Sequence, residues 1–303
     1  MATTHLLHPH SLVKIAKPLP VGIPLKSYVV LCKVGIAALS TFSAAAGFFL
    51  GGGEDIALLL STLLGIFLIA CGAASINQIQ EVSIDALMER TKGRPLVTGI
   101  ITKPQATFFA ALLIAIGLLL LFFMSGVMAA CLGAFAILWY NGVYTPLKRV
   151  TTMAFLPGGI VGAIPPMIGW VANGSHLFEE KILCLSLLLF MWQIPHFWLL
   201  LVRYGRQYQE AGLPSLCDRL TKKQIARMTL VWIAGVVAAT ALFPLFGVIA
   251  NVAVMTFVAL SGLLLLITGL VMIWGRSIER SSRLAFHAIN SYMLITLVAV
   301  SFS

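Results

Sequence analysis

Long, nearly uninterrupted apolar stretches alternate with short polar segments along this chain. Segments such as 111–123 and 183–190 show no two-residue alternation of polarity, so they favour helices over the strands of a membrane β-barrel. An α-helix needs roughly 20 residues to cross the hydrocarbon of a bilayer. On that criterion the predicted spans are residues 27–50, 56–79, 105–123, 127–144, 153–172, 182–202, 228–247, 252–274 and 284–302.

Composition supports this interpretation. Of the 303 residues, 60% are hydrophobic and only 10% are charged, whereas about a quarter of the residues in soluble domains carry charge. A soluble enzyme, a disordered chain and a disulfide-stapled secreted module are excluded. We therefore predict an all-α polytopic membrane protein, with about nine transmembrane helices around a central cavity that opens to the cytoplasmic face. A cytoplasmic tail, residues 1–26, is expected to precede a single transmembrane domain, residues 27–303.

Basic residues are distributed unevenly between the two sides of the predicted bundle. The chain has 20 lysines and arginines, and all but Lys181 fall on the side that includes the N-terminus. The positive-inside rule makes that side the cytoplasm, and nine spans then place the C-terminus outside. The net charge of +10 therefore indicates membrane topology rather than nucleic-acid binding. We expect the inner membrane of a bacterium, with the mitochondrial inner membrane as the alternative.

The connections between predicted spans differ in polarity. External connections such as 51–55 and 173–181 are short, whereas the cytoplasmic segments 80–104, 145–152 and 203–227 carry most of the polar side chains. Recognition of a polar ligand is therefore expected at the cytoplasmic face, between helix ends that converge there.

Three oxygen-bearing side chains, Asn77, Glu81 and Asp85, recur every fourth residue at the end of the second span. On a helix this spacing places them on one face. Hard oxygen ligands without His or Cys suit Mg²⁺ rather than Zn²⁺, so we predict that these three side chains bind Mg²⁺ and serve catalysis. The alternative is that Glu81 and Asp85 solvate a helix end and pair with Arg90. The nearness of Asn77 and Glu81 to the hydrocarbon favours a functional site.

Basic side chains follow the acidic face directly and return in a later turn. Arg90, Lys92 and Arg94 lie in the first cytoplasmic loop, and Lys148 and Arg149 lie in the 145–152 turn. Mg²⁺ and guanidinium groups together neutralise a diphosphate well. The pattern therefore predicts a diphosphate-binding site at the cytoplasmic face.

Four sequence strings resemble those of one enzyme family. They are Asn77–Leu96, Tyr144–Arg149, Gly158–Trp170 and Trp192–Phe197. With them the chain resembles the protoheme IX farnesyltransferases, a branch of the intramembrane aromatic prenyltransferase superfamily. The likeness covers roughly residues 33–214, and the strings Arg-Thr-x-x-Arg-Pro and Tyr-Thr-Pro-Leu-Lys-Arg are specific to this branch. It implies a nine-helix bundle open laterally to lipid, farnesyl diphosphate as donor, Mg²⁺ as metal, and a vinyl group of haem b as acceptor.

Roles for individual residues follow from that resemblance. The metal would be held by Asn77, Glu81 and Asp85, and Tyr144 would orient an oxygen or stabilise the allylic cation through its ring. The residues expected to bind the diphosphate are Arg90, Arg94, Lys148, Arg149 and Arg206. A haem O oxygenase (haem A synthase) is a candidate partner.

Two further ionisable residues lie in or near predicted spans. His196 would ligate the haem iron or contact a propionate, or it is a structural histidine bonded to a neighbouring helix. Lys33 would reach the diphosphate or a propionate, or its side chain snorkels to the membrane interface.

One stretch departs from the family's pattern. After the Pro-His-Phe string the family usually shows Arg-x-x-Asp-Asp-Tyr-x-x-x-Gly-x-Pro, but residues 203–214 carry Arg206 and Gln207 at the two aspartate positions. Either Arg206 neutralises diphosphate charge, or Glu210 or Asp218 replaces the missing ligand, or the activity has diverged.

Two other functions stay open at this point. A haem or lipid transporter would need ionisable residues at the midplane and a polar layer on both sides, but the external loops are nearly free of them. An enzyme with a quinone precursor or chlorophyllide as acceptor differs from the first hypothesis only in substrate.

Overall fold

The computed structural model describes residues 24–275 and 277–303, so nearly all of the expected tail, residues 1–26, lies outside the described part. The described residues form helices and connecting loops, without a β-strand. Two π-helical segments (121–125 and 139–144) and two short 3₁₀ turns (152–154 and 216–218) interrupt the series. The α-helices are α1 (Leu25–Cys32), α2 (Val34–Leu50), α3 (Ile56–Asp85), α4 (Lys103–Leu120), α5 (Val127–Leu138), α6 (Thr145–Leu147), α7 (Phe155–Ala172), α8 (Glu180–Glu210), α9 (Lys222–Ala241), α10 (Val252–Trp274) and α11 (Ile278–Ser301).

The number of membrane spans agrees with the sequence. Eight helical segments are long and apolar enough to cross a membrane, and the bent pair α1 and α2 makes a ninth. The all-α class is thereby confirmed, and eight spans, or nine if the bent pair is one span, agree with the predicted count of about nine. The predicted boundaries were less accurate, because α3 and α8 continue to Asp85 and Glu210 and contain 30 and 31 residues. Both helices therefore extend several residues beyond the predicted spans.

The first span is broken where α1 meets α2 at an angle of 51°. Lys33 at the break has φ 48° and ψ 48°, a left-handed conformation that costs a non-glycine residue roughly 1–2 kcal/mol. Side chains of α3 stabilise it. Gln78 Nε2 donates to the carbonyls of Val30 and Leu31, 2.9 Å from each, which satisfies acceptors at the end of α1. Asn77 Oδ1 accepts a hydrogen bond from Lys33 Nζ at 2.6 Å.

Glycines let α2 and α7 approach backbone to backbone. A Cβ at Gly47 would overlap the carbonyl group of Pro166, and one at Gly169 would overlap the carbonyl of Ala44. Small residues at helix interfaces stabilise membrane bundles because they permit such close packing. The two helices are therefore fixed firmly beside each other.

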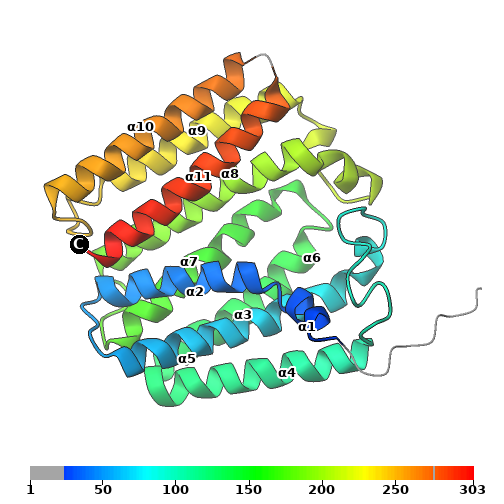
Figure 1. Ribbon diagram of the computed structural model, residues 1–303, viewed down its shortest axis with the longest axis horizontal. Coiled ribbons are helices and arrows are strands. Elements are labelled where there is room, and N and C mark those ends of the chain that lie inside the picture. The colour runs from blue at the N-terminus through cyan, green and yellow to red at the C-terminus, as the bar shows by residue number, and fades with distance from the viewer. Residues whose placement is uncertain (1–23, 276) are drawn as a thin grey trace, which may run out of the picture.

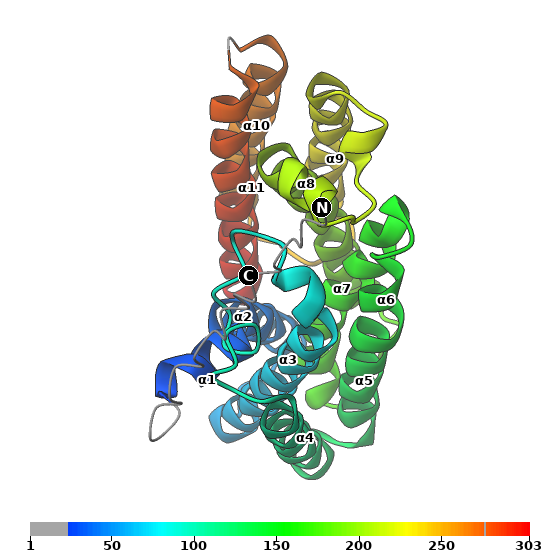
Figure 2. The ribbon, with the colours of Figure 1, turned by 90° about the vertical axis from the view of Figure 1, so that its right-hand side faces the viewer.

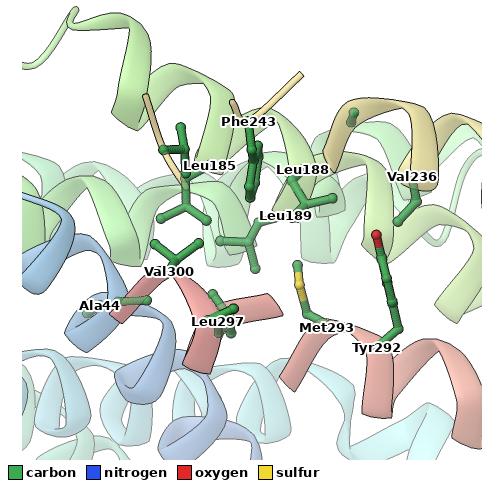
Figure 3. Close-up of a cluster of buried hydrophobic side chains, with 14 of the residues drawn as sticks. Ala44, Leu185, Leu188, Leu189, Val236, Phe243, Tyr292, Met293, Leu297 and Val300 are labelled. Carbon is green, nitrogen blue, oxygen red and sulfur yellow. The ribbon is translucent and has the colours of Figure 1, made fainter. Parts of the chain in front are cut away.

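A core of buried apolar side chains joins α2 to α8, α9 and α11. Figure 3 shows Ala44 from α2, Leu189 from α8, Val236 from α9 and Leu297 from α11 gathered in one cluster. These four side chains are at most 5% exposed. The cluster holds α8 and α11 against α2.

Polar helix ends gather on one side of the molecule. In Figure 1 the ends of α3 and α8 and the start of α4 lie toward the right, whereas the C-terminus of α11 lies at the left. Figure 2 shows α10 and α11 at one end of the bundle and α4 at the other. We call the side formed by residues 80–104, 145–152 and 203–227 the polar face.

Candidate functional site

The predicted metal-binding side chains share one buried face of α3. Asn77, Glu81 and Asp85 are 1%, 6% and 2% exposed, respectively. Burial of a carboxylate is costly unless the charge is paired and hydrogen-bonded. This face, which we call the acid face, therefore requires partners from elsewhere in the chain.

A different basic side chain contacts each member of the acid face. The pairs are Lys33 Nζ with Asn77 Oδ1 at 2.6 Å, Lys148 Nζ with Glu81 Oε1, and Arg94 Nη1 with Asp85 Oδ2 at 2.5 Å. These cations come from the α1–α2 break, from the turn after α6 and from the loop after α3. Three basic side chains face two carboxylates, so the cluster has more basic than acidic groups. The arrangement suits a polyanionic ligand.

Hydrogen bonds fix the acid face against the turn before α6. Asn77 Nδ2 donates to Thr145 Oγ1 at 3.1 Å, and Thr145 Oγ1 donates to the carbonyl of Tyr140 at 2.9 Å. Gln80 Nε2 donates to the carbonyl of Asn141 at 3.0 Å. Tyr140 and Asn141 belong to a π-helical segment, a local irregularity that occurs frequently at functional sites. The hydrogen bonds of this segment set the orientation of the Asn77 amide.

Tyr144 and Arg149 also lie beside α3. The Tyr144 ring stacks on Tyr140, with centroids 5.7 Å apart, and Lys148 Nζ lies 5.5 Å from the Tyr144 ring centroid. Arg149 Nη2 donates to the backbone carbonyl of Gln80. Tyr144 thus adjoins the Lys148 ammonium that pairs with Glu81, whereas Arg149 contacts the α3 backbone.

Arg90 does not pair with the acid face. Its guanidinium carbon lies 5.5 Å from the centroid of the Tyr204 ring, and Arg203 lies 4.9 Å from the same centroid. Asp85 and Glu81 are paired with Arg94 and Lys148 instead, so the expected alternative pairing with Arg90 is not observed. Arg90 instead connects the loop after α3 to α8.

The end of α8 makes mainly local contacts. Arg206 Nε pairs with Glu210 Oε1 at 2.8 Å, and the Arg206 side chain is 90% exposed. Asp218 accepts hydrogen bonds from the Ser215 amide and from Gln209 Nε2, both at 2.8 Å. The two acids considered as replacement ligands therefore have partners within residues 206–218.

His196 lies between α8 and α11 among aromatic rings. Its Nδ1 is 2.9 Å from Asn290 Oδ1, and its ring lies 5.0 Å from Trp192 and 4.9 Å from Phe286, centroid to centroid. Asn290 Nδ2 donates to the Phe286 carbonyl, which leaves Oδ1 as the acceptor. His196 Nδ1 therefore carries the proton, and Nε2 keeps a lone pair for a ligand.

The sequence profile of the UbiA prenyltransferase family matches residues 38–292, which include the whole acid face and His196. The chain belongs to the UbiA prenyltransferase family. Its resemblance to protoheme IX farnesyltransferases is also confirmed. It is 37% identical over 270 residues to the protein of that name from Oleidesulfovibrio alaskensis, covering 88% of this chain and 93% of the relative. It is 36% identical over 222 residues to the one from Geobacter sulfurreducens, covering 73% and 82%.

Solved structures of UbiA proteins have the same fold. A digeranylgeranylglyceryl phosphate synthase aligns with a TM-score of 0.74 at 18% identity, over 92% of this chain and 97% of that one. A UbiA homologue from Archaeoglobus fulgidus, bound to DMAPP and Mg²⁺, aligns with a TM-score of 0.72 at 16% identity, over 91% and 98%. At these identities the likeness establishes the fold.

The donor set of the acid face suits a hard divalent cation. Among residues 24–275 and 277–303, no cluster of three or more His, Cys, Asp and Glu side chains forms a metal site. The acid face instead combines two carboxylates with the amide oxygen of Asn77. Mg²⁺ is commonly held by one or two carboxylates and completes its shell with substrate phosphates and water. In a UbiA prenyltransferase these residues therefore fit Mg²⁺ together with a diphosphate.

The sequence left two interpretations open for Lys33 and did not indicate Thr145 as a site residue. The Lys33 side chain reaches Asn77 rather than the membrane interface. Its signal was a lysine inside an otherwise apolar span, which by default indicates function. Thr145 gave no comparable signal, because its role depends on contact with a helix 68 residues away in sequence.

Proposed function

We propose that this protein transfers the farnesyl group of farnesyl diphosphate to a vinyl group of haem b, which makes haem O. The observation that carries this proposal is the buried acid face of α3, in which each side chain is matched to one cation. The names of relatives that align with most of the chain support the choice of substrates.

Asn77, Glu81 and Asp85 hold the metal in this proposal. Bound there, Mg²⁺ would neutralise the diphosphate as it leaves. Lys148 and Arg94 each contact one of the two oxygens of a carboxylate, and Lys33 contacts the one side-chain oxygen of Asn77. An ion at the acid face would compete with these cations, whose donors would then become free for the diphosphate oxygens. Because each exchange keeps the charges balanced, metal and diphosphate should bind cooperatively.

The remaining cations of the polar face have secondary roles in the proposal. Arg90 and Arg149 are close enough to the acid face in sequence and fold to extend the diphosphate site, once their contacts with Tyr204 and Gln80 are exchanged. Arg206 would contribute only a weak long-range field, because its side chain is exposed and paired with Glu210 and is therefore screened by water and salt.

The reaction itself needs a dry environment beside the acid face. The bond between the farnesyl C1 and the diphosphate oxygen breaks, and the leaving diphosphate keeps the electron pair. Tyr144 stabilises the allylic cation through its ring. The vinyl carbon of haem then bonds to C1, and water captures the resulting cation and loses a proton. The product carries a hydroxyethylfarnesyl group.

His196 is the proposed contact for haem. The hydrogen bond from Nδ1 to Asn290 leaves Nε2 available to the iron or to a propionate. Neighbouring rings of Trp192 and Phe286 would pack against the porphyrin plane.

We further propose that the polar face is cytoplasmic, in the inner membrane of a bacterium, and that residues 27–303 form a single transmembrane domain. The bias of basic residues toward this face supports the orientation. A haem O oxygenase would receive the product, because haem O is too apolar to diffuse freely through water.

The decisive experiment incubates purified protein with haem b, farnesyl diphosphate and Mg²⁺ and analyses the haems by mass spectrometry. Haem O should form with the native protein but not with Asp85→Asn. Parallel reactions with a quinone precursor and with chlorophyllide test the acceptor. Prenylation of one of these, without haem O, would refute the proposed substrate and keep the enzyme class. If no prenylated product forms with any of the three acceptors, the proposed function is refuted.

A further inference from the structure

Two adjoining cavities lie where α9, α10 and α11 meet. The smaller, of about 120 Å³, and the larger, of about 520 Å³, share walls made by Lys223, Ile273, Trp274 and Ile278. None of the residues that line them belongs to the acid face or to the His196 cluster. These cavities are therefore separate from the proposed reaction site.

The walls combine apolar and basic side chains. Met272, Ile273 and Ile278 contribute hydrocarbon, and Lys223 and Arg227 contribute positive charge. A ligand that fits such a pocket has an acyl portion and an anionic group close together.

The two positive charges are available for a ligand. Lys222, which lines the larger cavity, is paired with Glu279 at 2.7 Å. Lys223 and Arg227 form no ion pair or side-chain hydrogen bond within residues 24–275 and 277–303, and both are exposed. A basic pair beside an apolar pocket complements the charge of a phosphate ester.

The cavities lie at the ends of helices that are long and apolar enough to cross a membrane. They line the end of span α10 and the starts of spans α9 and α11. Trp274, the last residue of α10, is 77% exposed, as is common for aromatic residues at the membrane–water interface. Because α9 follows the end of α8, this boundary is on the same side of the bundle as the polar face (Figure 1).

We propose that this pocket is a binding site for the phosphodiester headgroup of an anionic phospholipid from the surrounding leaflet. Lys223 and Arg227 contact the phosphate, and the first segment of an acyl chain packs against Ile273 and Trp274. Basic pockets between transmembrane helices on the cytoplasmic side bind anionic headgroups in this way. The site would attach α9, α10 and α11 to the leaflet.

The test uses the full chain in nanodiscs of phosphatidylcholine that contain a small fraction of brominated phosphatidylglycerol. Bromine quenches nearby tryptophan, and Trp274→Phe identifies the part of the quenching that comes from Trp274. We expect saturable quenching in the native protein. In the double variant Lys223→Gln/Arg227→Gln, the apparent affinity for the brominated lipid should fall about 25-fold, which is about fivefold for each basic residue.

Lys103→Gln is the matched control, because Lys103 is an exposed lysine on the same side at the start of α4, outside the pocket. It should leave the quenching unchanged. An equal loss in the control would refute a specific site and indicate general attraction of the leaflet. Displacement of the lipid by millimolar inorganic phosphate would show an anion site, and displacement by micromolar farnesyl diphosphate would show a substrate entry site. Either displacement would overturn the proposal, and so would unchanged quenching in the double variant.

Discussion

Helices α3 and α8 have similar lengths, but the side chains at their C-terminal ends differ in chemistry. Both helices pass beyond the hydrocarbon boundary predicted from the sequence, with 30 and 31 residues. At the end of α3 the carboxylates of Glu81 and Asp85 are buried and paired with cations of other segments. At the end of α8 the pair Arg206–Glu210 is one helical turn apart and exposed. Fixed charge in a buried environment acts strongly on a ligand, whereas an exposed pair is screened by water.

The end of α8 nevertheless holds one unusual group. Gln207, at one of the two positions where the related enzymes usually carry aspartate, has a buried Oε1 without a hydrogen-bond partner in the described part of the chain. A buried acceptor without a partner costs about 1–3 kcal/mol. The acid face of α3 therefore has two buried carboxylates, whereas the buried oxygen at the end of α8 belongs to a neutral amide.

Removing an acid-face carboxylate should have the largest effect. Asp85→Ala should lower farnesyl transfer roughly a thousandfold, because the site loses a metal ligand and the partner of Arg94. The measurement is haem O formation by mass spectrometry, with membrane insertion checked by size-exclusion chromatography. Glu89→Ala is the control, because Glu89 is exposed and, in the described part of the chain, forms an ion pair with Lys92 alone. Wild-type turnover in Asp85→Ala, with Mg²⁺ still required, would exclude Asp85 from the metal site.

The proposed exchange of cations can be tested at Lys148. Lys148→Gln should lower kcat/KM for farnesyl diphosphate about 10- to 100-fold, because a charged donor to the diphosphate is lost. The same change should raise the affinity for Mn²⁺ alone, because the ion no longer displaces an ammonium from Glu81. Mn²⁺ binding is measured by electron paramagnetic resonance without substrate. If kcat/KM for farnesyl diphosphate and the affinity for Mn²⁺ both fall, Lys148 only supports the packing of the site.

Features of α3 that depend on local periodicity were predictable from the sequence. The four-residue spacing of Asn77, Glu81 and Asp85 predicted a shared helix face, and this face is present because the helix continues to Asp85. The number of spans was predictable from hydropathy because, like the shared helix face, it depends on the local sequence pattern. The break at Lys33 was not predictable, because the left-handed residue is a lysine rather than a glycine and Gln78 stabilises it from another helix. The sequence predicted that basic side chains lie near the acid face, but it did not predict which basic side chain contacts which member of that face.

Adding acids to the end of α8 would make the two helix ends alike. The double variant Arg206→Asp/Gln207→Asp should tighten apparent Mg²⁺ affinity about tenfold, because affinity rises with the number of charged ligands. The measurement is the Mg²⁺ dependence of the initial rate at saturating farnesyl diphosphate. Arg219→Asp is the control for added negative charge on the same connection. An unchanged Mg²⁺ dependence would mean that the end of α8 lies away from the diphosphate.

The smallest effect is expected from the loss of the Arg206 charge itself. The Arg206 side chain is 90% exposed and its partner Glu210 is 57% exposed, so the pair is weak and screened. Arg206→Ala should therefore lower the rate at saturating Mg²⁺ by less than about threefold. Initial rates over a range of salt concentrations check this, because the remaining contribution should disappear at high ionic strength. A hundredfold loss that persists in high salt would show that Arg206 leaves Glu210 and neutralises the diphosphate directly. In that case both helix ends would neutralise the charge of the diphosphate, and the guanidinium of α8 would replace a second metal ion.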